Sequence, residues 1–400
     1  MKESLSIQQA RKLVLLSQKL PPTKQTGGAT AATLAAIEHL GYIQIDTISV
    51  IQRAHHHTLW NRNPRYKAVQ LSQLITEKKV FEYWSHAAAY LPMRDYRFSL
   101  VRKHALATGT LKQWYKRDDK MIKLVLDRIA GEGPLMARDF EYTGKKVGDW
   151  RAKPAKQALE YLFMQGDLMI ASRVNFHKVY DLTKRVLPEG IDTTLPEPEE
   201  YARFLITQYL RANGLGQPAE MAYLLTNTKR RVTATVQEMV EAGELLQVSV
   251  ADNSYYVLPE SLELLSKPLA RSKLKILSPF DNLLIQRKRM QALFEFDYLI
   301  ECYVPQVKRQ YGYFSLPILW DGKLVARMDC KADRKTTLLH IHNLAIEPTV
   351  KKTDVLFNAL RKELEAFLHF NDCTGLVLHK TSPAKVKSEL QVLMGDLLAS

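Results

Sequence analysis

The residues best suited to chemistry lie in the segment GYIQIDTISVIQRAHHHTLWNRNPRY, residues 41–66. Ile43 and Ile45 alternate there with Gln44 and Asp46. Residues two apart in a strand point to the same side, so we expect Gln44 and Asp46 to be presented together, opposite the two isoleucines. Solvated residues on an exposed strand would show the same alternation. The surroundings of the pair must therefore decide between a chemical and a purely structural reading.

Three consecutive histidines, His55, His56 and His57, follow this pair. Adjacent residues on a regular strand or helix cannot all turn to one ion, and no HxxxH, HExxH or cysteine cluster accompanies them. We therefore expect no metal site. Instead, His55 and His57 are expected to share a face near Gln44 and Asp46 and to hydrogen-bond phosphate or substrate. The alternative is that each is a capping or packing histidine.

Basic and aromatic residues dominate the rest of this segment. Arginine and lysine neutralise phosphates, and aromatic rings stack on bases or sugars. A solvated basic loop would have the same composition. The residues expected to contact DNA are Arg53, His55, His56, His57, Trp60, Arg62, Arg65 and Lys67.

The charge of the whole chain also indicates a polyanionic partner. Its 400 residues contain 57 Lys and Arg against 42 Asp and Glu, a formal net charge of +15. Residues 1–150 contain 24 of these basic and 13 of these acidic residues, so most of the excess is N-terminal. Nucleic acid is the expected partner, with an anionic membrane surface second.

Membrane insertion and secretion are not expected. No run approaches the roughly 18 apolar residues that a spanning helix needs, and the N-terminus lacks the pattern of a signal peptide. The three cysteines are far apart in sequence and odd in number, which indicates neither a disulfide framework nor a metal knuckle. These features predict a cytoplasmic protein.

An internal repeat predicts the elements that position the first segment. Residues 158–182 and 235–258 align at an offset of 77, which places Gly166 on Gly243. In each copy, apolar residues at helical spacing end at this glycine, and two extended segments joined by a turn follow. This order is typical of the wing of a winged helix-turn-helix. A third copy is expected at the N-terminus, where Gly41 takes the place of Gly166.

The repeat also provides an internal comparison for Asp46. The copy at residues 158–182 has Ala171 at this position, and the copy at residues 235–258 has Val248, or Gln247 or Ser249 if the register shifts by one residue. None of these residues is acidic, so a winged helix does not require Asp46. An acid on a DNA-facing surface repels phosphate, and a chemical role explains its presence better.

After residue 265 the pattern changes to strand-like runs, with a hairpin signal at WDGK. An amphipathic helix over 354–370 and a last strand over 375–379 follow. The predicted fold is α+β, with three tandem winged helix-turn-helix domains followed by a C-terminal β-barrel with an amphipathic helix. The expected domains are 1–115, with the Gln44 and Asp46 strand, then 116–195, 196–265, and the barrel domain 266–400.

With these residues considered together, the sequence resembles the YcaQ/AlkZ-like family of bacterial winged-helix DNA glycosylases. The resemblance rests on GYIQIDTISVIQRAHHHTLWNR and on the downstream stretches LSPFDNLLIQRKR, FDYLIECYVP, KRQYGYFSLPIL and LVARMDCKADRK. It implies hydrolysis of the N-glycosidic bond of N-alkylated purines such as N7-alkylguanine, and the unhooking of interstrand crosslinks. Gln44 and Asp46 match the family's catalytic Gln-x-Asp pair, and Asp46 indicates the YcaQ-like branch.

The resemblance further implies a metal-independent, monofunctional enzyme without a cofactor. Its expected partner is double-stranded DNA that contains alkylated or crosslinked purines, and it is expected to act as a monomer. Two alternatives remain open from the residues alone. One is a winged-helix transcription regulator without catalytic activity, and the other is a metal-dependent nuclease that uses Asp46 and the histidines.

Overall fold

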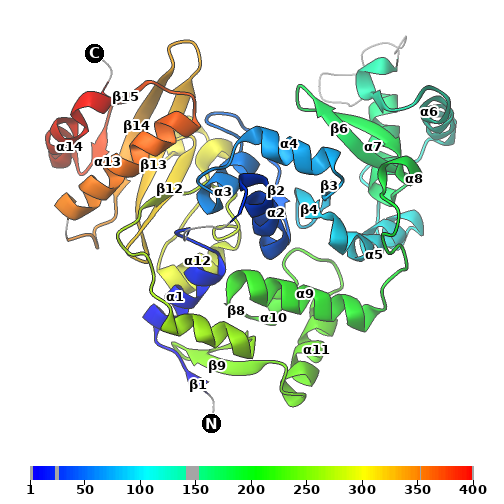
Figure 1. Ribbon diagram of the computed structural model, residues 1–400, viewed down its shortest axis with the longest axis horizontal. Coiled ribbons are helices and arrows are strands. Elements are labelled where there is room, and N and C mark those ends of the chain that lie inside the picture. Colours follow the sequence, from blue (N-terminus) through cyan, green and yellow to red (C-terminus); the bar gives the residue numbers. More distant parts are fainter. Residues whose placement is uncertain (1–2, 23–26, 141–152, 352, 399–400) are drawn as a thin grey trace. The chain divides into compact units, whose positions relative to one another are not determined.

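The computed structural model describes residues 3–22, 27–140, 153–351 and 353–398, and Figure 1 shows its ribbon. The protein is a mixed α and β structure that divides into two compact units. The first unit contains residues 1–67 and 205–400, and the second contains residues 68–204. Within the described ranges, no helix has the length and apolar character needed to cross a membrane.

The first unit contains the segment with Gln44 and Asp46. Its N-terminal elements are β1 (Glu3–Ser4), α1 (Ile7–Ser17), α2 (Ala29–Leu40), β2 (Ile43–Gln44) and α3 (Ala54–Arg62). Its middle elements are β8 (Leu215–Gly216), α10 (Pro218–Met221), α11 (Lys229–Glu241), β9 (Leu246–Val250), β10 (Asn253–Val257) and η3 (Pro259–Ser266). The remaining elements up to the last strands are β11 (Lys275–Ile276), α12 (Arg287–Phe294), η4 (Glu301–Tyr303), η5 (Gln306–Lys308), β12 (Ser315–Trp320), β13 (Lys323–Asp333) and β14 (Leu338–Ile346). The chain then forms α13 (Thr353–Phe370), β15 (Gly375–Leu378), β16 (Thr381–Ser382), η6 (Ala384–Val386), α14 (Lys387–Met394) and η7 (Gly395–Leu397).

The second unit is built from short helices and two hairpins. Its elements up to α6 are α4 (Ala68–Thr76), β3 (Val80–Trp84), β4 (Ala88–Pro92), η1 (Met93–Asp95), α5 (Tyr96–Ala107) and α6 (Asp119–Glu132). The others are β5 (Leu135–Met136), η2 (Ala137–Asp139), α7 (Pro154–Gln165), β6 (Leu168–Val174), β7 (His177–Leu182) and α8 (Thr183–Val186). Helix α9 (Pro198–Asn213) spans the division between the units.

The two hairpins predicted from the repeat are present. Strands β6 and β7 pair in an antiparallel manner, as do β9 and β10. Gly166 and Gly243 both have positive φ angles, of 97° and 73°, and Gly41 has 80°. This left-handed conformation ends a helix and suits glycine because it has no Cβ. In the copy at residues 235–258 Val248 is fully buried, so it cannot take the half-buried place of Asp46, and the structure adopts the register shifted by one residue.

Helix α1 begins at a capping box formed by Ser6 and Gln9. Its buried apolar residues belong to a core that also contains residues of β9, β10 and α12. Strand β1, just before it, pairs in parallel with β9. The N-terminus of the chain is therefore part of the four-stranded sheet β1-β9-β10-β8.

The C-terminal part contains a six-stranded sheet with the order β11-β12-β13-β14-β15, and β16 also pairs with β14. The predicted closed β-barrel is wrong, because in the described part of the chain β11 and β15 lie at opposite edges of this order. Strand β15 runs parallel to β14, a connection made by the intervening helix α13. This helix, coloured orange in Figure 1, lies across one face of the sheet. The predicted hairpin at Trp320–Lys323 and the predicted amphipathic helix are both confirmed.

Candidate active site

The segment with Gln44 and Asp46 starts from a fixed turn. Helix α2 ends at Gly41, where an added Cβ would lie 2.6 Å from Nε2 of Gln208. Nε2 of Gln208 in turn donates to the carbonyl of His39 over 2.9 Å. The turn therefore requires glycine for both its conformation and its space. It directs the chain into β2, which contains Ile43 and Gln44.

The predicted alternation of the two faces is confirmed. Ile43 is fully buried and Ile45 is 8% exposed, whereas Gln44 and Asp46 are half-buried. The regular strand covers only the first two of these residues, and Asp46 lies in the irregular segment that follows. An Oδ1 atom of Asp46 accepts a hydrogen bond from the amide of Ile48 over 2.6 Å. This bond fixes the orientation of the carboxylate.

The electrostatic environment of Asp46 is that of a partly desolvated acid. Burial raises the pKa of its carboxyl above the usual range, while the amide of Ile48 and the charge of Arg53 act in the opposite direction. A carboxylate with a raised pKa is a stronger base than an exposed one. It is therefore suited to accept a proton from water or to stabilise a neighbouring positive charge.

The residues after Asp46 are attached to the six-stranded sheet. The amide of Ala332 on β13 donates to the carbonyl of Val50 over 2.9 Å, and Arg334 donates to the carbonyl of Ser49 over 3.3 Å. The amide of Gln52 donates to Oδ1 of Asn371 over 2.9 Å. The carboxylate is thus anchored on both sides, by the buried isoleucines before it and by the sheet after it.

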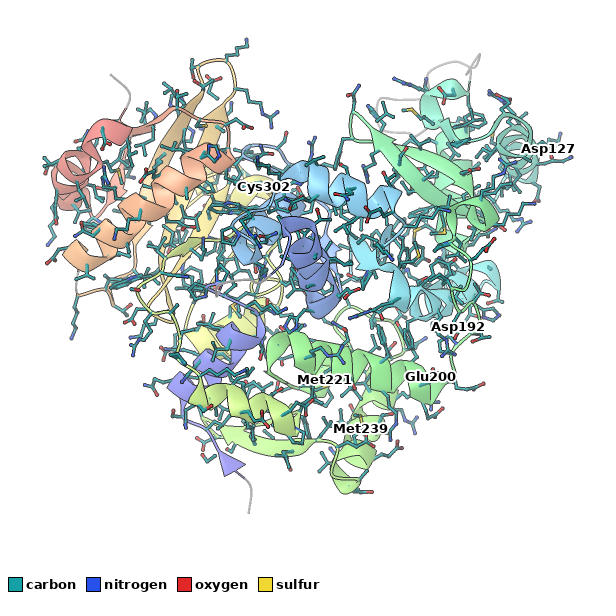
Figure 2. The ribbon with its side chains drawn as sticks, in the orientation of Figure 1. Asp127, Asp192, Glu200, Met221, Met239 and Cys302 are labelled. Atoms are coloured by element: carbon teal, nitrogen blue, oxygen red, sulfur yellow. The ribbon has the colours of Figure 1, made fainter. Side chains whose placement is uncertain are left out.

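A second segment, residues 299–313, approaches the carboxylate from far along the sequence. Partial desolvation raises the pKa of Cys302 and of Tyr303, although Tyr303 lies largely at the surface, and the charge of Asp46 raises both further. Figure 2 labels Cys302, which lies on the segment that follows α12. The side chain of Tyr303 is 79% exposed. The thiol and the phenol therefore lie within electrostatic range of Asp46, and the sequence patterns did not single them out.

Residues 299–313 are held in shape by carboxylates rather than by a regular ladder. Oε1 of Glu301 accepts from the amide of Gln310 over 2.8 Å, and Oε2 accepts from the amides of Tyr311 and Gly312 over 2.8 and 2.9 Å. These bonds lower the pKa of Glu301 even though burial acts against them. The segment is therefore ordered while it exposes several large side chains. These are Leu299, Tyr303, Val307 and Tyr313.

The three histidines lie on helix α3, not on a strand. His57 is fully buried and its Nε2 contacts the carbonyl of Ile276 over 2.9 Å, while its ring packs against Phe367. His55 is 2% exposed. Residues two apart on a helix are about 200° apart around its axis, so the prediction that His55 and His57 share a face near Asp46 is wrong.

His56 lies between these two and is only partly exposed. Its Nδ1 contacts the hydroxyl of Tyr66 over 2.7 Å. Burial lowers the pKa of His56 and of His57 to about 4, so both rings are neutral near neutral pH. A neutral imidazole does not neutralise a phosphate. Burial therefore gives His55 and His57 a packing role, whereas His56 stays partly exposed.

Two further predicted DNA contacts, Trp60 and Arg62, are corrected by their burial. Trp60 is 6% exposed and stacks on Phe370 with ring centroids 4.6 Å apart. Arg62 is fully buried and makes an ion pair with Asp281, which is also fully buried. A side chain in this position cannot reach a phosphate, so both residues stabilise the first unit instead.

The other predicted basic contacts remain at the surface. Arg65 and Lys67 are exposed, and Arg53 is partly exposed at the start of α3. Arg65 also donates to the carbonyl of Gly27 over 2.8 Å. No group of three or more histidine, cysteine or acidic side chains able to hold a metal ion occurs among the described residues.

Comparison with known proteins supplies the context for this geometry. The model of the family described as "DNA glycosylase AlkZ-like" matches residues 37–370. Among solved structures, the fold is similar to that of Streptomyces sahachiroi DNA glycosylase AlkZ, with a TM-score of 0.64. The two chains are 16% identical, and the similarity covers 94% of this chain and 100% of the other. The matched range includes Gln44, Asp46, Cys302 and Tyr303.

Proposed function

The chain belongs to the AlkZ-like DNA glycosylase family, and on that premise we propose that it releases N-alkylated purines, such as N7-alkylguanine, from DNA by hydrolysis. The observation that supports this best is the half-buried Asp46 carboxylate, oriented by the amide of Ile48 and presented on the same face as Gln44. Its raised pKa and its neighbour Tyr303 fit a reacting group better than a solvated surface acid.

The chemistry needs few protein groups. An N7-alkylguanine base already carries a positive charge and leaves as a neutral base, so no general acid is required. In the proposed mechanism Asp46 polarises the attacking water and faces the positive charge that develops on the sugar. Gln44 orients this water through its amide. Positioning and electrostatic stabilisation of this kind provide most of the rate enhancement.

The reaction is proposed to be metal-independent and monofunctional. Water is the nucleophile in this scheme, so no lysine has to form a Schiff base with the sugar. The product is an abasic site that is cleaved by alkali. Because Asp46 must be ionised, the rate is expected to rise with pH through its raised pKa.

DNA is proposed to bind along the surface that surrounds Asp46 in the first unit. The exposed side chains of Tyr303 and Val307 project from an ordered segment that also contains Lys308 and Arg309. Apolar and aromatic side chains beside basic ones fit a surface that stacks on nucleotides and neutralises phosphates. Arg53, Arg65 and Lys67 are proposed to extend this surface.

Unhooking of interstrand crosslinks is part of the proposal. A crosslinked base is tethered to the opposite strand and cannot rotate freely into a deep pocket. Gln44 and Asp46 are half-buried rather than enclosed, which supports action on a base that stays close to the duplex. Asp46, at the second position of the Gln-x-Asp pair, supports assignment to the YcaQ-like branch.

The architecture behind this activity is proposed to consist of three winged-helix units. The order α6, β5, α7, β6, β7 and the order α9, β8, α10, α11, β9, β10 each provide helices followed by a hairpin, with a short strand beside it. This arrangement supports the second and third units. The protein is proposed to work as a monomer without a cofactor.

One assay tests the function. Duplex DNA that contains 7-methylguanine or a defined crosslink is incubated with the protein in EDTA, and the products are examined with and without alkali. The proposal predicts released base and strand cleavage only after alkali. Strand scission that EDTA abolishes would indicate a metal-dependent nuclease, and sequence-specific binding without base release would indicate a transcription regulator.

A further inference from the structure

Three histidines lie together on the six-stranded sheet, apart from the run on α3. His340 and His342 are two apart on β14, and His379 follows β15. Nδ1 of His340 and Nε2 of His379 are 3.1 Å apart. The ring of His342 lies 5.4 Å from that of His379, with an angle of 21° between the planes. His342 and His379 are exposed and His340 is partly exposed.

The geometry of this three-histidine cluster does not suit a metal. The rings are stacked and nearly parallel, with 14° between His340 and His342, so their nitrogen lone pairs do not converge on one point. It is not one of the side-chain groups able to hold a metal among the residues described. The cluster is instead a group of stacked imidazoles that face solvent.

The contact between His340 and His379 depends on one shared proton. A neutral imidazole has one N–H donor and one acceptor nitrogen, so one ring donates and the other accepts. The neutral pair can take up one proton and keep this contact, because the imidazolium then donates to the neutral ring. A second added proton would place two N–H groups face to face and two positive charges in contact. An anion that accepts from both N–H groups removes this conflict, and its binding therefore favours uptake of the second proton.

The groups that surround the cluster set its charge. Lys331 on β13 lies directly opposite His340, and the charge of Lys387, on α14, acts on His379. Lys380 follows His379 in the chain and is exposed. Two acids are also in electrostatic range of the cluster, Asp333 of His340 and Asp329 of His342.

Both of these acids are already engaged. The amide of Lys335 donates to Asp333 over 2.9 Å, and the amide of Phe314 donates to Asp329 over 2.7 Å. Arg309, on the neighbouring segment, also acts on Asp329. Three lysines, Lys331, Lys380 and Lys387, surround the cluster against two acids. The surroundings are therefore net positive before the histidines take up any proton.

The segment that contains Asp46 is attached to the same six-stranded sheet as the cluster. Residues 49–50 lie along the end of β13, where Ala332 donates to Val50. Strands β14 and β15 follow on the other side of β13. Neighbouring strands are about 4.8 Å apart, so the cluster is two to three strand spacings from this segment. Because a duplex carries a phosphate about every 3.4 Å along each strand, a duplex that extends from Asp46 across this part of the sheet would bring a phosphate to the cluster.

We propose that His340, His342 and His379 bind a phosphate of the DNA backbone and take up a proton from solvent when they do so. The inference rests on the proposed function only in that DNA is the ligand. Binding of DNA should then become tighter as the pH falls, by at most tenfold per pH unit for each proton taken up. No covalent step is involved.

The test compares the wild-type chain with the triple variant H340N/H342N/H379N on an undamaged fluorescent duplex. Between about pH 7.5 and pH 6, on either side of the ordinary histidine pKa, the wild-type affinity should rise at least about threefold more than that of the variant. His369→Asn, which removes an exposed histidine on α13, is the matched control and should behave like the wild type. Thermal unfolding checks that all three proteins are folded.

Calorimetric titration of the same duplex in two buffers of different ionisation enthalpy counts the protons directly. The wild type should take up more protons per bound duplex than the triple variant. Equal uptake, or equal pH dependence of the two affinities, would overturn the proposal. Because undamaged DNA is used, this outcome is independent of base release. A chain that excises bases without the pH difference contradicts the inference and leaves the proposed function intact.

Discussion

Replacement of Arg62 separates a structural role from a DNA-binding role most sharply. Its guanidinium donates to both carboxylate oxygens of Asp281, to the side chain and carbonyl of Gln18, and to the carbonyl of Thr58. Arg62→Met removes all of these bonds and leaves Asp281 buried without its cation. Breaking a buried pair on one side costs about 3–5 kcal/mol. This is a large part of the roughly 5–15 kcal/mol that stabilises a typical domain.

The assay is urea unfolding followed by DNA binding at several salt concentrations. With a urea slope of about 3 kcal/mol per M, the loss lowers the unfolding midpoint by about 1–1.7 M. Arg62→Met/Asp281→Leu replaces both charges with apolar groups and should recover much of the loss, because no unpaired charge is left in the interior. The DNA affinity of the folded fraction, and its dependence on salt, should remain those of the wild type.

The exposed Lys67 provides the opposite control. Lys67→Met should change the free energy of unfolding by less than about 0.5 kcal/mol. If Lys67 contacts a phosphate, this variant also reduces the slope of log affinity against log salt by about 0.9. An Arg62→Met protein with an unchanged midpoint and a reduced salt slope would refute the structural role and restore Arg62 as a DNA contact.

Two further predictions follow from other buried or reactive groups. Lys103 is 4% exposed, its Nζ lies 4.0 Å from the centre of the Tyr96 ring, and burial lowers its pKa to about 7. Between about pH 7 and pH 10, Lys103 is protonated in the unfolded chain but neutral in the folded chain. The free energy of unfolding should therefore rise with pH, by about 1–3 kcal/mol from pH 7 to 9. Urea unfolding at both pH values should show this rise in the wild type and not in Lys103→Met, and equal rises would contradict it. Cys302 is partly exposed beside Asp46, so saturating DNA should slow its alkylation by iodoacetamide at least about threefold, as partial burial of a thiol would. Mass spectrometry measures the alkylation rate of Cys302. An equal rate with and without DNA would mean that DNA does not bind over this residue.

The sequence was sufficient where the pattern is local. Alternation with a period of two predicted that Gln44 and Asp46 share a face, because the buried Ile43 and Ile45 determine the orientation of this segment. Glycine at the end of a helix predicted the conformation of Gly166 and Gly243. Both inferences depend on residues within a few positions of one another.

The errors arise where distant residues decide the environment. A run of three histidines has no period that distinguishes a strand from a helix, and His57 is buried by Ile276 and Phe367, more than 200 positions away. Arg62 reads as a surface arginine until Asp281 is placed beside it. The open order of the six-stranded sheet likewise depends on β15 joining β14 in parallel, which the strand patterns do not encode.

Tyr303 and Cys302 were missed for the same reason. The stretch FDYLIECYVP was recognised only as part of the family resemblance, because nothing in its spacing indicates chemistry. An exposed tyrosine is uninformative in sequence and becomes informative only when the structure places it near Asp46.

Single-turnover release of 7-methylguanine by Asp46→Asn tests the central claim most directly. Asparagine keeps the size of the side chain and can still accept from the amide of Ile48, but it cannot act as a base or stabilise a cation with a full charge. We expect base release at least about tenfold slower than in the wild type, equivalent to about 1.4 kcal/mol of transition-state stabilisation, with DNA affinity retained. Asp127→Asn, which changes an exposed aspartate on α6, should have no effect. Near wild-type release by Asp46→Asn would contradict the proposed mechanism.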